Sequence, residues 1–127
     1  MKKLALLVLP FFLSGCMVYN AFFTAKYDTN EYELVSKIRT LATTTDCSTD
    51  ITDKAYEMWF YSVQFKHFTQ YIPKNEKANE MANKLADITL GLHNKHGDMS
   101  KKYCEEKLKV IAISTEEIQR VLGSKPR

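Results

Sequence analysis

The chain has 127 residues, which is the size of one domain and too short for a multidomain enzyme. Apolar residues make up 45% of it and charged residues 26%, a balance typical of a globular protein rather than a disordered one. The 18 Lys and Arg residues against 15 Asp and Glu residues give a net charge of +3, which is too small and too dispersed for a nucleic-acid-binding surface. We therefore expect a single folded domain that binds no nucleic acid.

The first residues carry the features of an export signal. Lys2 and Lys3 precede an apolar run over residues 4–13, which is shorter than the roughly 20 residues of a membrane-spanning helix. The run ends in Leu13-Ser14-Gly15-Cys16, which resembles the bacterial lipobox, where the Cys becomes the acylated first residue of the mature protein. The alternatives are an ordinary signal peptide with an incidental Cys, or a buried first helix.

The lipobox resemblance implies that residues 1–15 are a cleaved signal peptide and that Cys16 carries diacylglyceryl and acyl chains. Several chains hold a protein stably at a membrane, because each buried CH₂ contributes about 0.8 kcal/mol and one chain alone binds marginally. Met17 stands where inner-membrane lipoproteins tend to have Asp, so the resemblance implies an outer-membrane protein that faces the periplasm. We expect a polar, extended, lipidated tether over residues 16–29 and a helical domain over residues 30–127.

Cys47 and Cys104 remain once Cys16 is assigned to lipid. An even pair of cysteines in an exported protein predicts a disulfide, because that compartment is oxidising. Such a cross-link stabilises the fold by about 4 kcal/mol on the chain-entropy view. A zinc site with His93 and His96 is the alternative, but the paired C-x-x-C of strong zinc sites is absent, so we expect no metal.

Four segments show helical periodicity, and hairpin signals such as Asn-Gly or Asp-Gly are absent from the sequence. The segments run from about Glu31 to Thr43, from about Ile51 to Tyr71, from after Asn75 towards Gly97, and from near Ser100 to Gly123. Asn30 is the expected cap of the first, with Glu33 completing a capping box. Pro73 marks the stop of the second, and Gly97 and Gly123 are the expected C-terminal glycines of the last two.

Each segment has one face suited to a core. The expected inner positions are Leu34, Val35, Ile38, Leu41 and Ala42; then Ile51, Ala55, Met58, Ser62, Phe65 and Ile72; then Ala78, Met81, Ala82, Leu85, Ile88 and Leu92; and last Cys104, Leu108, Ile111, Thr115, Ile118 and Leu122. The run 110–113 can also be read as a strand, but the flanking Glu and Lys residues and the sustained spacing favour helix. The sequence therefore predicts an all-α fold.

Short connections favour antiparallel neighbours, so we expect a small four-helix bundle that runs up, down, up and down. In that topology Cys47 and the first turn of the last helix meet at one end, which brings Cys47 close to Cys104. Both chain ends lie at the opposite end, near the lipid. The basic tail Lys125-Pro126-Arg127 is then expected to face the membrane surface.

The second segment is unusually rich in aromatic residues, which surround nearly its whole circumference. A bundle helix has one buried side, so aromatic side chains left outside suit a protein partner. We single out five residues as partner-binding: Trp59, Phe60, Tyr61, Phe65 and Phe68. The alternative is that the short first helix leaves the second enclosed and that all its aromatics are core.

Catalytic motifs are absent from the sequence, which has no G-x-S-x-G, no H-E-x-x-H and no phosphate-binding glycine loop. Adjacent carboxylates such as Glu105–Glu106 and Glu116–Glu117 point about 100° apart on a helix, so a solvated face explains them. His67 fits a helix surface better than a general base. We expect no enzymatic activity and no cofactor.

Two separated stretches resemble small lipoproteins of tailed phages. They are Tyr27-Asp28-Thr29-Asn30-Glu31-Tyr32-Glu33-Leu34, and the end from Tyr103-Cys104 through Ile118-Gln119-Arg120-Val121-Leu122-Gly123 to Lys125-Pro126-Arg127. The commonest role of such proteins is the outer-membrane spanin subunit, which pairs across the periplasm with an inner-membrane coiled-coil partner and helps disrupt the outer membrane at lysis. This chain departs from the short, Pro-rich type of that family, since it has only three prolines.

The architecture also resembles the lipoprotein pilotins of type II secretion. Those are small four-helix bundles in which a disulfide joins the region between helices one and two to helix four, and they deliver a secretin subunit to the outer membrane by binding one of its helices. Cys47 and Cys104 match that layout. A superinfection-exclusion lipoprotein that blocks an outer-membrane receptor is a third possibility, and all three are binding proteins without catalysis.

Overall fold

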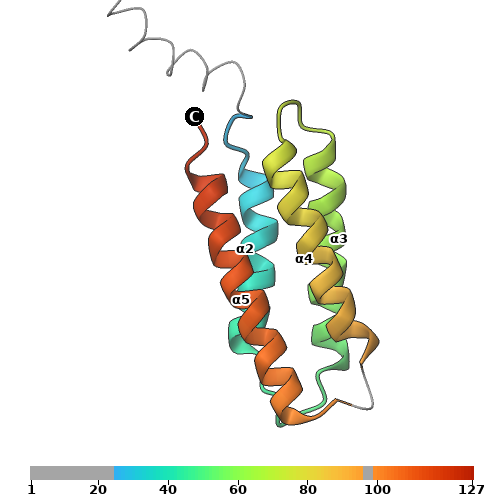
Figure 1. The fold of residues 1–127 in the computed structure, drawn as a ribbon. Helices are drawn as coiled ribbons and strands as arrows, with labels where there is room; N and C mark the ends of the chain where they lie inside the picture. Colours follow the sequence, from blue (N-terminus) through green and yellow to red (C-terminus); the bar gives the residue numbers. More distant parts are fainter. Residues whose placement is uncertain (1–24, 96–98) are drawn as a thin grey trace, which may run out of the picture.

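The computed structural model describes residues 25–95 and 99–127, and these form an antiparallel bundle (Figure 1). Its helices are α2 (Thr29–Thr44), α3 (Thr52–Gln70), α4 (Glu76–Asn94) and α5 (Lys101–Gly123). The described residues contain no strand, which confirms the all-α prediction. The predicted signal peptide, the lipidation site at Cys16, and His96 and Gly97 lie outside the described residues.

Each helix packs against its two neighbours in a ring, with α2 between α3 and α5, and α4 between the same two helices. In Figure 1 the α2–α3 and α4–α5 connections lie at one end, and the α3–α4 turn, the C-terminus and the entry to α2 lie at the other. We call these the disulfide end and the tether end. At the disulfide end Cys47 is bonded to Cys104 with their Cα atoms 5.8 Å apart, so the predicted disulfide is confirmed.

The first helix begins earlier than the sequence suggested. Asp28 is its N-cap, and the carboxylate of Asp28 accepts hydrogen bonds from the backbone N–H groups of Asn30 (2.8 Å) and Glu31 (3.2 Å). The prediction that Asn30 caps α2 with Glu33 is therefore wrong. With Asp28 as the cap, Glu31 falls inside the first turn, and its side chain is buried.

The core follows the predicted periodicity with a few shifts. All six predicted positions of α5 are buried, as are Ile51, Ala55, Met58, Ser62 and Phe65 in and before α3. Thr69 rather than Ile72 completes the α3 face, because the helix ends at Gln70 and Ile72 belongs to the following turn. The buried hydroxyls bond to carbonyls within their own helices, for instance Ser62 to Met58 at 2.7 Å, so they carry no desolvation penalty into the core.

Residues 25–28 belong to the folded bundle rather than to an extended tether. Ala25 is buried, and its N–H donates to the carbonyl of Lys74 in the α3–α4 turn at 3.1 Å. The N–H of Tyr27 donates to the carbonyl of Pro126 at 2.9 Å. The incoming chain is thus fastened to both the turn and the C-terminal tail, which corrects the expected tether over its last residues.

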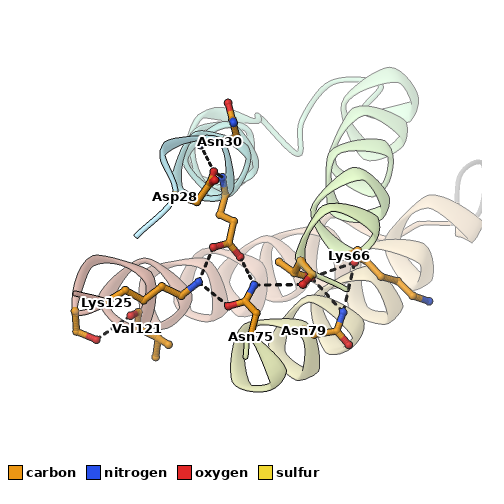
Figure 2. Close-up of polar contacts among 10 residues, drawn as sticks. Asp28, Asn30, Lys66, Asn75, Asn79, Val121 and Lys125 are labelled. Carbon is orange, nitrogen blue, oxygen red and sulfur yellow. Dashed lines mark hydrogen bonds and ion pairs between the residues drawn. The ribbon is translucent and has the colours of Figure 1, made fainter. Parts of the chain in front are cut away.

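A buried polar cluster closes the tether end. Lys125 Nζ donates to Glu31 Oε1 at 2.5 Å and to Asn75 Oδ1 at 2.6 Å, and Asn75 Nδ2 donates to Glu31 Oε2 at 2.7 Å. Figure 2 shows Lys125 and Asn75 pointing toward one another from the tail and the α3–α4 turn. All three side chains are buried, so the expectation that Lys125 faces the membrane surface is wrong. A carboxylate in the interior needs a paired cation, and the tail supplies it.

Candidate functional site

A groove runs between α2 and α3 along the half of the bundle nearer the tether end. It has a volume of about 780 Å³. Its lining consists of Asn30, Glu33, Leu34 and Lys37 from α2, and Phe60, Val63, Gln64, His67, Phe68 and Tyr71 from α3 and its C-cap. From Phe60 to Tyr71 the groove follows about 16 Å of helix at 1.5 Å per residue.

The groove exists because α3 carries apolar side chains on two opposite sides. One stripe, with Met58, Ser62 and Phe65, is fully buried in the bundle core. The second set, Phe60, Val63 and Tyr71, lies on the opposite side of the helix, because at 100° per residue these positions fall about 140° to 220° from Met58. Their side chains point away from the core, so the aromatic ones remain accessible.

The two predicted partner residues that line this groove are Phe60 and Phe68. Phe60 is 42% exposed, and its ring stacks with that of Tyr56 at a centroid separation of 6.0 Å. Phe68 is half-buried at the groove wall. Both side chains are therefore available to a ligand without a change of fold.

The other three predicted partner residues lie elsewhere. Trp59 is half-buried towards α4 and stacks on His93, with centroids 5.2 Å apart and planes at 9°. Tyr61 is half-buried against the core, with Lys37 Nζ 5.5 Å above its ring. Phe65 has no exposed surface, so its assignment as a partner-binding residue is wrong and the core alternative holds for it.

Three apolar or aromatic groove residues were absent from the predicted partner-binding set: Leu34, Val63 and Tyr71. Leu34 is half-buried and packs against the core, as expected, and it also lines the groove. Tyr71 is 80% exposed, the highest value among the exposed large hydrophobic side chains of the described residues. The helical spacing from Phe60 to Tyr71 is the signal that identifies this second stripe.

The groove has an apolar floor and a mixed polar rim. Glu33 and Lys37 stand on the α2 side and Gln64 and His67 on the α3 side, so the rim offers both charges and neutral donors. Small-molecule sites gather a few polar groups around one point, which this rim does not do. An elongated apolar groove with polar edges suits one face of an amphipathic helix.

The described residues were also compared with what a metal site or a membrane-spanning helix requires. Residues 25–95 and 99–127 hold no group of three or more His, Cys, Asp or Glu side chains able to bind a metal ion. Glu105 and Glu106 are exposed beside Lys101 and Lys102, as expected for a solvated face. None of the helices in this part of the chain is long and apolar enough to cross a membrane.

The resolved pKa shifts belong to exposed residues outside the groove. Backbone and side-chain hydrogen bonds from Ser48 lower the pKa of Asp46, in the loop that contains Cys47. The Lys84 side chain lowers the pKa of Glu80, and the pKa of Lys84 is raised in return. These shifts report local pairing on the surface rather than an acid–base site.

Comparison of the chain with protein-family models, with curated proteins and with solved structures finds no match.

Proposed function

We propose that this protein is a lipid-anchored outer-membrane protein that binds one helix of a periplasmic partner in the α2–α3 groove, and that it acts as the outer-membrane subunit of a phage spanin pair. The observation that carries the proposal is the accessible aromatic floor of that groove. It lies beside a core that is already complete, so its side chains are free to serve binding.

The division of α3 into two stripes supports a binding role. Met58 and Phe65 have no exposed surface and account for the core contacts of this helix. Phe60 stays 42% exposed, although burying such a ring is strongly favourable. Aromatic residues that surround a groove are the usual anchors of protein interfaces, and a docked helix would bury them.

The direction of the groove suits a partner that approaches along the bundle axis. The groove follows α2 and α3, so a helix docked in it lies parallel to the bundle. The longest helix, α5, has 23 residues and is about 35 Å long. The bundle therefore covers only part of a periplasmic distance, and an extended coiled-coil partner supplies the remainder.

A pilotin is the second candidate, and the disulfide favours it. Cys47 lies between α2 and α3, and Cys104 lies in the first turn of α5. This layout is the one on which the resemblance to pilotins rests. In that case the groove takes a helix of an outer-membrane secretin subunit, with the same residues as contacts.

Photo-crosslinking in the native host tests the proposal and separates the two candidates. A photoreactive phenylalanine analogue replaces Phe60 in the groove, and a matched variant carries it at Ile113, which is 56% exposed on α5 and lies outside the groove. We expect Phe60, but not Ile113, to capture an inner-membrane coiled-coil protein. Capture of an outer-membrane channel subunit would favour the pilotin, and equal capture from both positions would reject the groove as the binding site.

Gene deletion gives an independent readout of the same proposal. Loss of a spanin subunit arrests lysis, with cells left spherical, whereas normal lysis after deletion would reject the spanin assignment. For the anchor, the Cys16→Ser protein is expected to leave the membrane fraction. A Cys16→Ser protein that stays membrane-bound would refute lipidation at that position.

A further inference from the structure

The α3–α4 turn at the tether end exposes an aromatic and a basic side chain together. Tyr71, at the C-cap of α3, is 80% exposed. Pro73 and Lys74 follow it on the surface, and Lys74 adopts the left-handed conformation with φ of 61°. The turn therefore projects a large ring beyond the end of the helix.

The described part of the chain begins at this same turn. The N–H of Ala25 donates to the carbonyl of Lys74 at 3.1 Å, which fixes that first residue in place. Nine residue steps separate Ala25 from Cys16, and a fully extended chain of that length spans at most about 30 Å. A lipid on Cys16 thus keeps the turn within reach of the bilayer surface.

The charge at this end favours an anionic surface. Within residues 25–30, 71–77 and 123–127, the exposed charged side chains are Lys26, Lys74, Lys77, Arg127 and Glu76. Cations therefore outnumber carboxylates by four to one among them. Basic residues beside a bilayer are attracted to anionic headgroups, and tyrosine is enriched at the same depth.

The polar cluster makes the turn a rigid platform. Asn75, the last residue before α4, is buried, and it bonds to Glu31, to Lys125 and to the carbonyl of Thr69 (3.3 Å). The tail is held beside it, with the Arg127 guanidinium 4.9 Å from the Tyr27 ring centroid. A surface that is ordered beforehand loses little conformational entropy when it binds.

We infer that the tether end of the bundle rests in the headgroup layer of the membrane, with Tyr71 at the interface and Lys26 and Arg127 beside it. The partner of this surface is a lipid bilayer. The inference deepens the proposed function and rests on the lipid anchor at Cys16. It places the bundle upright on the membrane, with the disulfide end pointing away and the groove rising from the surface.

Tyr56 provides a matched control on the same helix. It is 46% exposed and lies near the disulfide end, about 22 Å along α3 from Tyr71. Trp59 is the only tryptophan of the chain, so a Trp59→Phe background leaves each new tryptophan as a single probe. The variants are Tyr71→Trp and Tyr56→Trp in that background, with Pro73→Trp as a second probe of the turn.

The experiment measures tryptophan quenching by brominated lipids in the lipidated full-length protein, reconstituted in phosphatidylethanolamine–phosphatidylglycerol vesicles. We expect Tyr71→Trp and Pro73→Trp to be quenched about twofold more than Tyr56→Trp, because only the turn reaches the interface. Vesicle flotation is measured on the same samples, and circular dichroism confirms the helical fold.

Each other outcome overturns a distinct statement. Equal quenching at Tyr71→Trp and Tyr56→Trp in floating vesicles would overturn the upright placement and leave the anchor intact. The absence of quenching at both turn positions in floating vesicles would reject the membrane contact, and Tyr71 would then be a contact for the protein partner. A protein that fails to float would overturn the lipid anchor and the inference together.

Discussion

The two ends of the bundle are closed by different chemistry. At the disulfide end a single covalent bond joins Cys47 to Cys104 across a sequence separation of 57 residues. At the tether end three buried side chains, Glu31, Asn75 and Lys125, bring together α2, the α3–α4 turn and the C-terminal tail. The disulfide requires only that two cysteines lie close together. The polar cluster requires that three side chains form hydrogen bonds with one another.

The two closures stabilise the bundle by different mechanisms. A disulfide acts mainly by restricting the unfolded chain, and its native environment matters little as long as the geometry is met. A buried ion pair gains little net free energy over an apolar replacement, yet removing one member leaves the other charge buried and unpaired. The disulfide end is thus robust to neighbouring changes, whereas the tether end is sensitive to any single change in the cluster.

The largest expected effect comes from opening the disulfide end. The double variant Cys47→Ser/Cys104→Ser is expected to lose about 4 kcal/mol of unfolding free energy, since the unfolded chain regains the entropy of an open loop. Urea denaturation followed by circular dichroism measures the loss. A difference below about 1 kcal/mol would show that the chain-entropy account does not hold for this bundle.

A somewhat smaller loss is expected at the tether end. Glu31→Gln removes the charge that balances Lys125, and we expect the free energy of unfolding to fall by about 3 kcal/mol. The amide oxygen still accepts a hydrogen bond from Lys125, which keeps the effect at the lower end for a broken buried pair. The same urea titration measures it.

The matched control for that change removes both charges at once. Glu31→Leu/Lys125→Met leaves no unpaired ion, so its unfolding free energy is expected to lie closer to that of the parent than that of Glu31→Gln does. If the double variant is the less stable of the two, the cluster contributes net stability of its own. The polar cluster would then resemble the disulfide in adding to the free energy of unfolding.

A third change tests the seam between the ends, where α2 meets α5. Gln119 accepts a hydrogen bond from Arg39 at 2.7 Å and donates one to the Ser36 hydroxyl at 2.8 Å. Gln119→Ala is expected to cost about 1 kcal/mol, because all three groups keep access to water or to other partners. Gln70→Ala, at the exposed last residue of α3, is the control. Equal unfolding free energies of the two variants would show that the hydrogen bonds of Gln119 do not stabilise the α2–α5 contact.

The smallest effect concerns the pH response of the disulfide end. Hydrogen bonds from the backbone and side chain of Ser48 hold the pKa of Asp46 below its ordinary value of 3.8. The Asp46 carboxylate therefore stabilises the fold at pH values above its pKa in the unfolded chain. This stabilisation is lost as the pH falls through its lower pKa in the folded protein. Carbon-detected NMR of the Asp46 carboxyl should give a midpoint below 3.8, and a midpoint at or above that value would contradict the hydrogen bonds.

Most of the fold could be predicted because the bundle depends on periodic patterns. The spacing of Cys104, Leu108 and Ile111 continues along α5, and every position in that series is buried. The disulfide followed from topology, since helix direction alone brings Cys47 to the start of α5. These features depend on local spacing and on the order of elements, both of which are visible in the sequence.

The polar cluster could not be predicted in the same way. Glu31 and Lys125 are 94 positions apart. Each continues the spacing of the core positions beside it, Glu31 four residues before Val35 and Lys125 three after Leu122, but a charged side chain at the end of such a series does not by itself indicate burial. The position of Glu31 depends on Asp28 capping the helix, a choice between two neighbouring capping residues. Only the assembled end of the bundle shows that the tail returns to pair with it.

The groove was foreseen in part. The abundance of aromatics on α3 indicated that some lie outside the core, which holds for Phe60 and Phe68. The spacing of Met58, Ser62 and Phe65 already placed Phe65 on the inner face, so including it among the partner contacts was the error. The groove side chains lie on the opposite side of α3, and only the assembled bundle shows that α2 stands beside them.

The pairing of Glu31 with Lys125 also bears on how the chain folds. The α3–α4 hairpin joins neighbours in sequence, whereas α2 meets α5 through distant contacts such as Arg39 with Gln119, 80 positions apart. Until the disulfide has formed, loop-closure entropy delays long-range contacts of this kind. In refolding from the reduced chain we therefore expect the first and last helices to dock late, so that changes in the cluster accelerate unfolding far more than they slow folding.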